Sequence, residues 1–171
     1  MKKIILFIIV SIILCSCKSN DLHTTNYFSS VTIDTLLQDK ISIRALLIDK
    51  EKIWYAADQS RFGCIDLKSN QKKEIQIPAD KNREYRSIAQ TKEHIFILSV
   101  ANPALLYRIS KKDLSYELVY QETHEKVFYD SMQFWNDMEG IAIGDPIEGV
   151  FSLLKTIDGG KTWEKTPAKL L

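Results

Sequence analysis

The sequence predicts an all-β protein, and three observations lead to this fold class. Apolar side chains alternate over short runs, for example Ile53 with Tyr55 and Ile95 with Ile97, as expected for half-buried strands. Polar turns bound these runs. No stretch after residue 17 has the spacing and caps of a long amphipathic helix. Strands and turns therefore account for the folded part of the chain, from about Val31 onward.

The alternating runs occupy equivalent places in a repeat. The residues Ile53, Ile95 and Ile141 mark this repeat with spacings of 42 and 46 residues. One apolar strand precedes each of these runs, and two more strands follow it. The first repeat has predicted strands at 42–48, 52–58, 61–66 and 73–78, the second at 85–90, 93–100, 104–110 and 115–121, and the third at 128–135, 139–145, 150–156 and 162–166.

Four strands that recur every forty-odd residues are typical of the blades of a β-propeller. We therefore predict a partial propeller in residues 31–171, with about three blades at residues 42–78, 85–121 and 128–167. A β-sandwich is the alternative, because short strands separated by turns also fit two packed sheets. The regular period favours the propeller.

The amino terminus has the features of an export signal. Two lysines precede an apolar run at residues 4–14, which is shorter than the roughly 20 residues of a membrane-spanning helix. The stretch LCSC at residues 14–17 resembles the lipobox of bacterial lipoproteins. This resemblance implies that residues 1–16 are a signal peptide and that Cys17 is lipidated. Residues 17–30 would then tether the folded domain to the membrane.

The same resemblance places the protein in a bacterial cell envelope. Residue Lys18 follows the lipidated cysteine and is not the aspartate that retains some lipoproteins in the inner membrane, so the outer membrane is favoured. The alternative is an ordinary signal peptide that contains two incidental cysteines.

Charge and cysteine content narrow the classes of partner and cofactor. The chain has 23 basic and 22 acidic side chains, so no basic excess favours nucleic-acid binding. Once Cys15 is removed with the signal and Cys17 carries lipid, Cys64 alone cannot close an internal disulfide. The three histidines lie far apart in sequence, and we expect neither a metal site nor another cofactor.

A short motif near the end of the third repeat resembles the Asp-box of bacterial neuraminidase repeats. The pattern S/T-x-D-x-G-x-T-W is matched in the stretch TIDGGKTW by five residues: Thr156, Asp158, Gly160, Thr162 and Trp163. We interpret the motif as structural, because an aspartate in such a turn accepts backbone hydrogen bonds and glycines permit positive φ. The tryptophan would bury its ring and pair its N–H. The second repeat keeps a weaker version, and the first keeps only the hairpin.

The repeats also resemble the photosystem II stability/assembly factor-like proteins, which are sialidase-related propellers. The likeness covers residues 42–167, and its strongest segments are Phe134-Trp135, the run from Gly140 to Pro146 and the Asp-box motif. It implies a propeller that serves as a non-catalytic binding or assembly module. The photosystem role itself is not implied for this chain.

Members of that family are about twice as long and have about seven blades. We therefore expect a truncated, split or partnered propeller, whose partner is another protein or the missing blades. The segment Val31–Leu37 is predicted as an outer strand without a neighbour, and the outer faces of the first and third blades are expected to lie open.

A glycan-cleaving, sialidase-like hydrolase, of which this chain is the N-terminal half, is the alternative function. Such enzymes need an arginine cluster, an acid/base aspartate and a Tyr–Glu pair, and we find no complete catalytic constellation. Three residues are candidates for a ligand-binding face, with a glycan as one ligand: Arg44, Asp58 and Asp145. Two of them also have a simpler interpretation, because Arg44 can pair with a neighbouring acid and Asp145 lies between Gly144 and Pro146 in a predicted turn.

Overall fold

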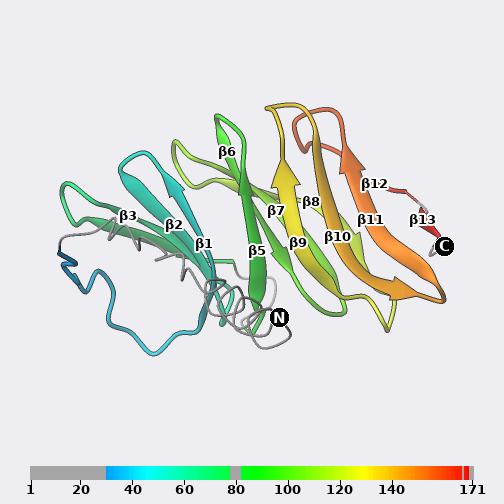
Figure 1. The fold of residues 1–171 in the computed structure, drawn as a ribbon, viewed down its shortest axis with the longest axis horizontal. Helices are drawn as coiled ribbons and strands as arrows, with labels where there is room; N and C mark the ends of the chain where they lie inside the picture. The colour runs from blue at the N-terminus through cyan, green and yellow to red at the C-terminus, as the bar shows by residue number, and fades with distance from the viewer. Residues whose placement is uncertain (1–29, 78–81, 167, 170–171) are drawn as a thin grey trace, which may run out of the picture. The chain divides into compact units, whose positions relative to one another are not determined.

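The computed structural model describes residues 30–77, 82–166 and 168–169, in which every regular element is a β-strand. Contacts divide the chain into two units, residues 1–35 and 36–171. The second unit holds three antiparallel sheets that follow one another along the chain (Figure 1). We call them blade one (β1–β4), blade two (β5–β8) and blade three (β9–β12, with β13 added beside β11).

The strand bounds agree closely with the predicted repeats. Blade one contains β1 (Ile43–Asp49), β2 (Lys52–Ala57), β3 (Arg61–Asp66) and β4 (Lys72–Gln76). Blade two contains β5 (Tyr85–Gln90), β6 (His94–Ser99), β7 (Ala104–Ser110) and β8 (Tyr116–Glu122). Blade three contains β9 (Tyr129–Phe134), β10 (Gly140–Ile147), β11 (Val150–Thr156), β12 (Glu164–Lys165) and β13 (Ala168–Lys169).

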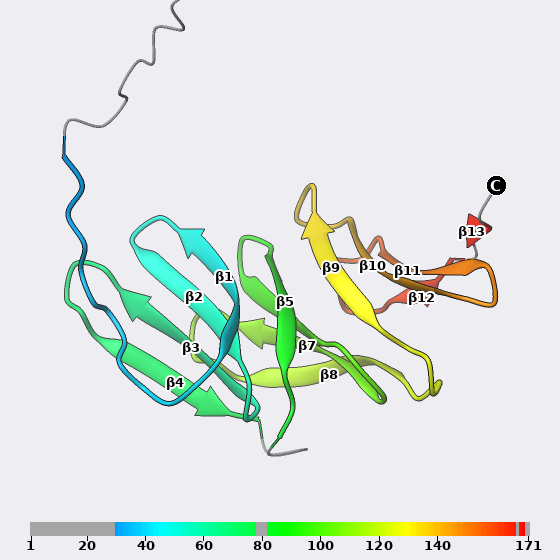
Figure 2. The same cartoon turned by 60° about the horizontal axis from the view of Figure 1, so that its bottom comes forward.

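Within each blade the strands pair in sequence order, and β5, the first strand of blade two, contacts both β1 and β9, the first strands of the other blades (Figure 2). Three successive four-stranded sheets exclude the β-sandwich alternative, which needs two packed sheets. Blade two lies between the other two blades, so both faces of its strand β6 are buried. Its side chains alternate between two cores, with Ile95 and Ile97 in one core and Phe96 and Leu98 in the other.

The two cores hold the blades together. Blades one and two share a core made of Ala45, Trp54, Ala56, Phe62, Cys64, Ile77, Tyr85, Ile95, Ile97, Leu105, Tyr107 and Ile109. Blades two and three share a core made of Ala89, Phe96, Leu98, Ala104, Leu106, Val127, Tyr129, Met132, Phe134, Ala142, Leu154 and Trp163. The free thiol of Cys64 is buried in the first core, where burial raises its pKa.

The strand predicted at Val31–Leu37 is not formed. Residues 30–38 have no regular secondary structure, and Val31 and Ile33 are 77% and 89% exposed. A strand needs a hydrogen-bonded neighbour, and no described strand pairs with this segment. The predicted signal peptide, Cys17 and residues 17–29 of the tether lie outside the described residues. No helix long and apolar enough to cross a membrane occurs in the described ranges.

Candidate functional site

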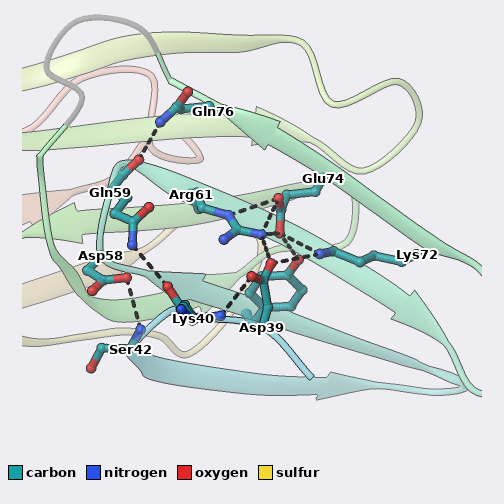
Figure 3. Close-up of polar contacts among 10 residues, drawn as sticks. Asp39, Lys40, Ser42, Asp58, Gln59, Arg61, Lys72, Glu74 and Gln76 are labelled. Carbon is teal, nitrogen blue, oxygen red and sulfur yellow. Dashed lines mark hydrogen bonds and ion pairs between the residues drawn. The ribbon is translucent and has the colours of Figure 1, made fainter. Parts of the chain in front are cut away.

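The three residues proposed for a ligand-binding face lie at one end of the blades but make separate contacts. On β1, Arg44 is half-exposed, and its Nε lies 3.2 Å from Glu84 Oε1. Directly after β2, Asp58 accepts a hydrogen bond from the N–H of Ser42 (2.9 Å), and its own N–H donates to the Ser42 carbonyl (3.0 Å; Figure 3). These contacts extend the β1–β2 pairing, which gives Asp58 a structural role.

The predicted turn at Asp145 is wrong, because β10 continues through this residue to Ile147. The Asp145 N–H donates to the Phe128 carbonyl (2.8 Å), while its side chain is exposed. The backbones approach so closely here that a Cβ on Gly144 would lie 2.1 Å from the Phe128 oxygen. Among the described residues, no hydrogen bond or ion pair joins Arg44, Asp58 and Asp145 to one another.

The segment Thr156–Trp163 forms a turn organised by one carboxylate. Asp158 accepts hydrogen bonds from the N–H groups of Lys161 and Thr162 (both 3.0 Å) and from the hydroxyls of Thr156 (2.9 Å) and Thr162 (2.7 Å). Burial alone would raise the pKa of Asp158, but these hydrogen bonds outweigh it and lower the pKa to about 2. The ionised carboxylate therefore holds the turn at neutral pH.

This turn also fastens blade three to blade two. The ring of Trp163 lies edge-on to Phe134 (5.6 Å between centroids) and to Phe96 (6.3 Å). Gly160 has a φ of +74°, and a Cβ there would lie 2.2 Å from the Phe96 ring. The Trp163 N–H was expected to find a partner, but none is present among the described residues. Ring packing, rather than a hydrogen bond, therefore positions this tryptophan.

The other two blades have a comparable carboxylate outside the Asp-box pattern. In blade two, Asp113 accepts hydrogen bonds from the N–H (3.1 Å) and hydroxyl (2.7 Å) of Ser115. In blade one, Asp66 does the same for Ser69 (2.9 and 3.0 Å). The serine follows the aspartate by three residues in blade one and by two in blade two, whereas Thr162 follows Asp158 by four. The fixed spacing of the Asp-box pattern therefore does not match these two turns. An aspartate followed two or three residues later by serine would have been the signal.

Two hydrogen-bonded Tyr–Glu pairs are present among the described residues. In blade one Tyr55 donates to Glu74, and between blades two and three Tyr129 donates to Glu122 (2.8 Å). Both tyrosine rings are fully buried. Burial is the main cause of the raised pKa of each hydroxyl, and the neighbouring glutamate raises it further. A nucleophilic tyrosine needs an accessible hydroxyl with a lowered pKa, so these pairs fit structural contacts.

The outer face of blade one, which faces away from blade two, is covered by the segment before β1. We call residues Leu37–Ile41 the strap. Leu37 and Ile41 pack against Tyr55, Ala57 and Ile65, which are at most 4% exposed. The expectation that this face lies open is therefore wrong for its centre, because part of the chain's own sequence covers it. Leu46 and Ile48 at its β1 edge remain exposed, at 63% and 71%, and Ile43, which pairs with Ala57, is 36% exposed.

A cluster of charges fastens the strap (Figure 3). Arg61 donates from Nη2 to Asp39 Oδ2 (2.5 Å) and, through Nε and Nη2, to both oxygens of Glu74 (2.9 Å each). Lys72 adds a contact to Glu74 Oε2 (3.0 Å). The hydrogen bond from Arg61 holds the pKa of Asp39 below its usual value. The arginine thus joins the strap to strand β4 across β3.

The outer face of blade three, which faces away from blade two, has no such cover. Met132, Ala142 and Leu154 point toward the second core, so the alternate residues of the same strands point outward. This outer face carries Ile141, Ile143, Phe151 and Leu153. Ile143 is 41% exposed, and the other three are partly exposed. An apolar sheet surface of this kind is a candidate contact surface for another protein segment.

No family model matches this chain, and neither does any curated protein sequence. Similarity is found among solved structures. YCF48, in a structure described as bound to a D1 peptide, superposes with a TM-score of 0.58 at 12% identity, over 73% of this chain and 39% of YCF48. The U3-55K structure and the RRP9 WD40 repeats each give a TM-score of 0.57 at 13% identity, over 77% and 76% of this chain and 41% and 40% of theirs.

These similarities establish the fold, because sequence identity this low carries no functional detail. The protein is an all-β chain that forms three blades of a β-propeller, as the strand period predicted. The chain spans about two fifths of the length of these propellers. In the part of the chain that the structure describes, no group of three His, Cys, Asp or Glu side chains is placed to hold a metal ion.

Proposed function

We propose that this chain is a non-catalytic binding or assembly module, held at the bacterial envelope by lipid on Cys17, whose propeller blades pack against a protein partner. The observation that carries this proposal is the outer face of blade three, with Ile143 exposed among Ile141, Phe151 and Leu153. Neighbouring blades bury both faces of strand β6 in blade two, so a further blade or an equivalent protein surface fits this face. The description of YCF48 bound to a peptide supports a binding role.

The assembly proposal is tested by size-exclusion chromatography with light scattering on the full chain in detergent. We expect the wild-type chain to form oligomers or to remain bound to a partner. Ile143→Lys should shift it to monomer without changing its melting temperature, because a charge on this face opposes apolar packing. The matched control is Leu118→Lys, since Leu118 is also exposed (46%) but lies on the last strand of blade two. A wild-type monomer with a sharp melt would contradict the proposal.

The anchor proposal rests on the LCSC match at residues 14–17 and on Lys18. Metabolic labelling with a fatty-acid analogue should label the wild-type protein, which should fractionate with the outer membrane. Cys17→Ser should abolish the label, whereas Cys15→Ser should keep it, because Cys15 leaves with the signal peptide. An unlabelled wild-type protein, or one that loses its label only in Cys15→Ser, contradicts lipidation of Cys17.

A further inference from the structure

The three blades together form a cavity at the end opposite to Arg44 and Asp58. The β1–β2, β5–β6 and β9–β10 turns line it, together with Lys111 from the β7–β8 turn, and its volume is about 420 Å³. Neither the Asp-box motif nor the candidate ligand residues lie on its wall. Cavities of this size, where several elements converge, are common places for a ligand or a partner side chain.

The cavity has cations that its own carboxylates do not neutralise. Asp49 accepts a hydrogen bond from Lys111 Nζ (2.7 Å), and Asp137 accepts one from the backbone N–H of Lys92 (2.6 Å). Asp49 is therefore paired with Lys111, whereas Asp137 keeps its negative charge, so the wall carries three lysines against two carboxylates. Lys50 and Lys92 are exposed on the wall, and their ammonium groups make no ion pair with a described residue. The cavity is thus suited to an anionic group.

An exposed tryptophan forms one wall and is held in a fixed position. Trp135 is 55% exposed, yet its indole N–H donates to Glu139 Oε2 (3.2 Å), which also accepts from Asn136 Nδ2 (2.8 Å). Asn136 Oδ1 in turn accepts the N–H groups of Met138 and Glu139 (2.8 Å each). Because the turn is already ordered, a ligand that stacks on Trp135 would lose little conformational entropy.

Two further exposed apolar side chains lie on neighbouring turns of the same blade. Met138 is 54% exposed on the β9–β10 turn, and Ile157 is 66% exposed on the following β11–β12 turn. The two turns are joined by a hydrogen bond from the Gly159 N–H to the Met138 carbonyl (2.9 Å). Trp and Met are enriched where proteins bind other proteins. A free sugar would use the tryptophan and the polar wall, but it would gain little from the two aliphatic side chains.

We propose that this surface, defined by Trp135, Met138, Ile157, Lys50 and Lys92, binds a peptide segment of another protein in which a carboxylate adjoins an apolar side chain. The carboxylate enters the cavity beside Lys50 and Lys92. The apolar side chain contacts Trp135 and continues toward Met138 and Ile157. This inference rests on the proposed function as a binding module, but it uses a different surface from the outer face of blade three.

The test is selection of phage-displayed random peptides on the full chain in detergent, followed by affinity measurement with a fluorescent recovered peptide. The recovered peptides should combine Asp or Glu with an adjacent apolar residue. Trp135→Ala, and separately Lys50→Glu combined with Lys92→Glu, should each weaken binding by about tenfold or more. The matched controls are Leu118→Ala and Lys126→Glu, which change exposed residues elsewhere and should leave the affinity unchanged.

Thermal melts confirm that each variant is folded, and the lysine variant decides the question if Trp135→Ala does not fold. Three results overturn the inference: recovery of no binding peptide, recovery of peptides without the acidic and apolar pairing, or binding that both site variants leave intact. Direct binding of soluble polygalacturonate that Trp135→Ala weakens, without any peptide binding, would assign the site to an acidic glycan instead. The blade-three proposal is unaffected by these outcomes, because Ile143→Lys tests it separately.

Discussion

The outer faces of blade one and blade three are built from equivalent strands, but only one of them is covered. On blade one, Tyr55 and Ala57 are fully buried beneath the strap. On blade three, Ile143 remains 41% exposed in the corresponding central part of the sheet. Each blade needs a neighbour on its apolar face. The contrast shows that a short segment, held by Arg61 of strand β3, can take the place of a neighbouring blade.

The two faces also differ in chemistry. The covered face carries polar groups along its outer strands, so Arg61, Glu74 and Tyr55 satisfy one another and the strap residue Asp39. The uncovered face carries the apolar side chains of Ile141, Ile143 and Leu153 along β10 and β11, with the exposed Lys155 opposite Ile141. Directional hydrogen bonds and ion pairs fix one segment in one position, whereas apolar side chains can pack against a broad surface. The first face is closed within the chain, and the second is the face that we propose for assembly.

The largest expected effect is the loss of the buried ring beneath the strap. Tyr55→Ala should lower the free energy of unfolding by about 3–5 kcal/mol, because it leaves a cavity in a fully buried site. Ile143→Ala on the uncovered face should lower it by less than about 1 kcal/mol. Denaturant unfolding of both variants measures the difference. Equal losses would mean that the strap does not seal blade one in solution.

The cluster of Arg61, Asp39 and Glu74, which we call the latch, should contribute less to the free energy of unfolding than the buried ring of Tyr55. Arg61→Ala should lower the free energy of unfolding by about 2–3 kcal/mol, because it leaves the carboxylates of Asp39 and Glu74 without their arginine in a partly buried site. The matched control is Arg86→Ala, whose exposed pair with Glu84 (3.3 Å) should contribute at most about 1 kcal/mol. If Arg61→Ala lowers the free energy of unfolding no more than Arg86→Ala does, the latch does not hold the strap in place.

The latch should also depend on pH. Burial alone would raise the pKa of Glu74, but hydrogen bonds from Tyr55, Arg61 and Lys72 hold it below its ordinary value of 4.5. A carboxyl whose pKa is lowered by folding stabilises the protein above its unfolded pKa, and the contribution is lost as pH falls through the folded value. The stability difference between wild type and Arg61→Ala should therefore be constant near neutral pH and shrink below pH 4.5. A difference that is unchanged in acid would contradict this origin.

A smaller effect is expected at the turn that fastens blade three. Asp158→Ala should lower the free energy of unfolding by about 1–2 kcal/mol, because four hydrogen bonds to the carboxylate are lost in a partly exposed turn. Since folding lowers the pKa of Asp158 from 3.8 to about 2, this contribution should disappear as pH falls through that interval. Thermal melts across the interval measure it, and Asp113→Ala in the more exposed turn of blade two serves as the milder comparison. A variant that melts normally but loses binding would show a functional aspartate.

The smallest stability change is expected on the uncovered face. Ile143→Lys should change the free energy of unfolding by no more than about 0.5 kcal/mol, because its side chain is partly solvated already. Its effect should appear in the oligomeric state instead. Urea unfolding of the monomeric fraction checks the first statement, and a large loss of stability would show that the face is part of the fold rather than a contact surface.

The fold could be predicted from the sequence to within a few residues at most strands. The bounds of β2, β6 and β11 follow from alternating apolar residues, which is a local pattern set by the geometry of a strand. The prediction was less accurate where pairing decides the outcome. Residues 31–37 have the composition of a strand, but no described strand pairs with them. Asp145 is flanked by residues typical of a turn, but it lies inside β10, which pairs with both β9 and β11.

Local sequence patterns predict the class of fold, the three blades and the position of the turn at Asp158, because strand alternation, repeat length and turn residues are short-range properties. Only the tertiary structure decided which blade face is covered. Arg61 meets Asp39 across 22 residues and Glu74 across 13, and neither separation follows a recognisable pattern. The cavity beside Trp135 likewise exists because three turns from different repeats converge. Such contacts depend on how the sheets pack side by side, which no local pattern encodes.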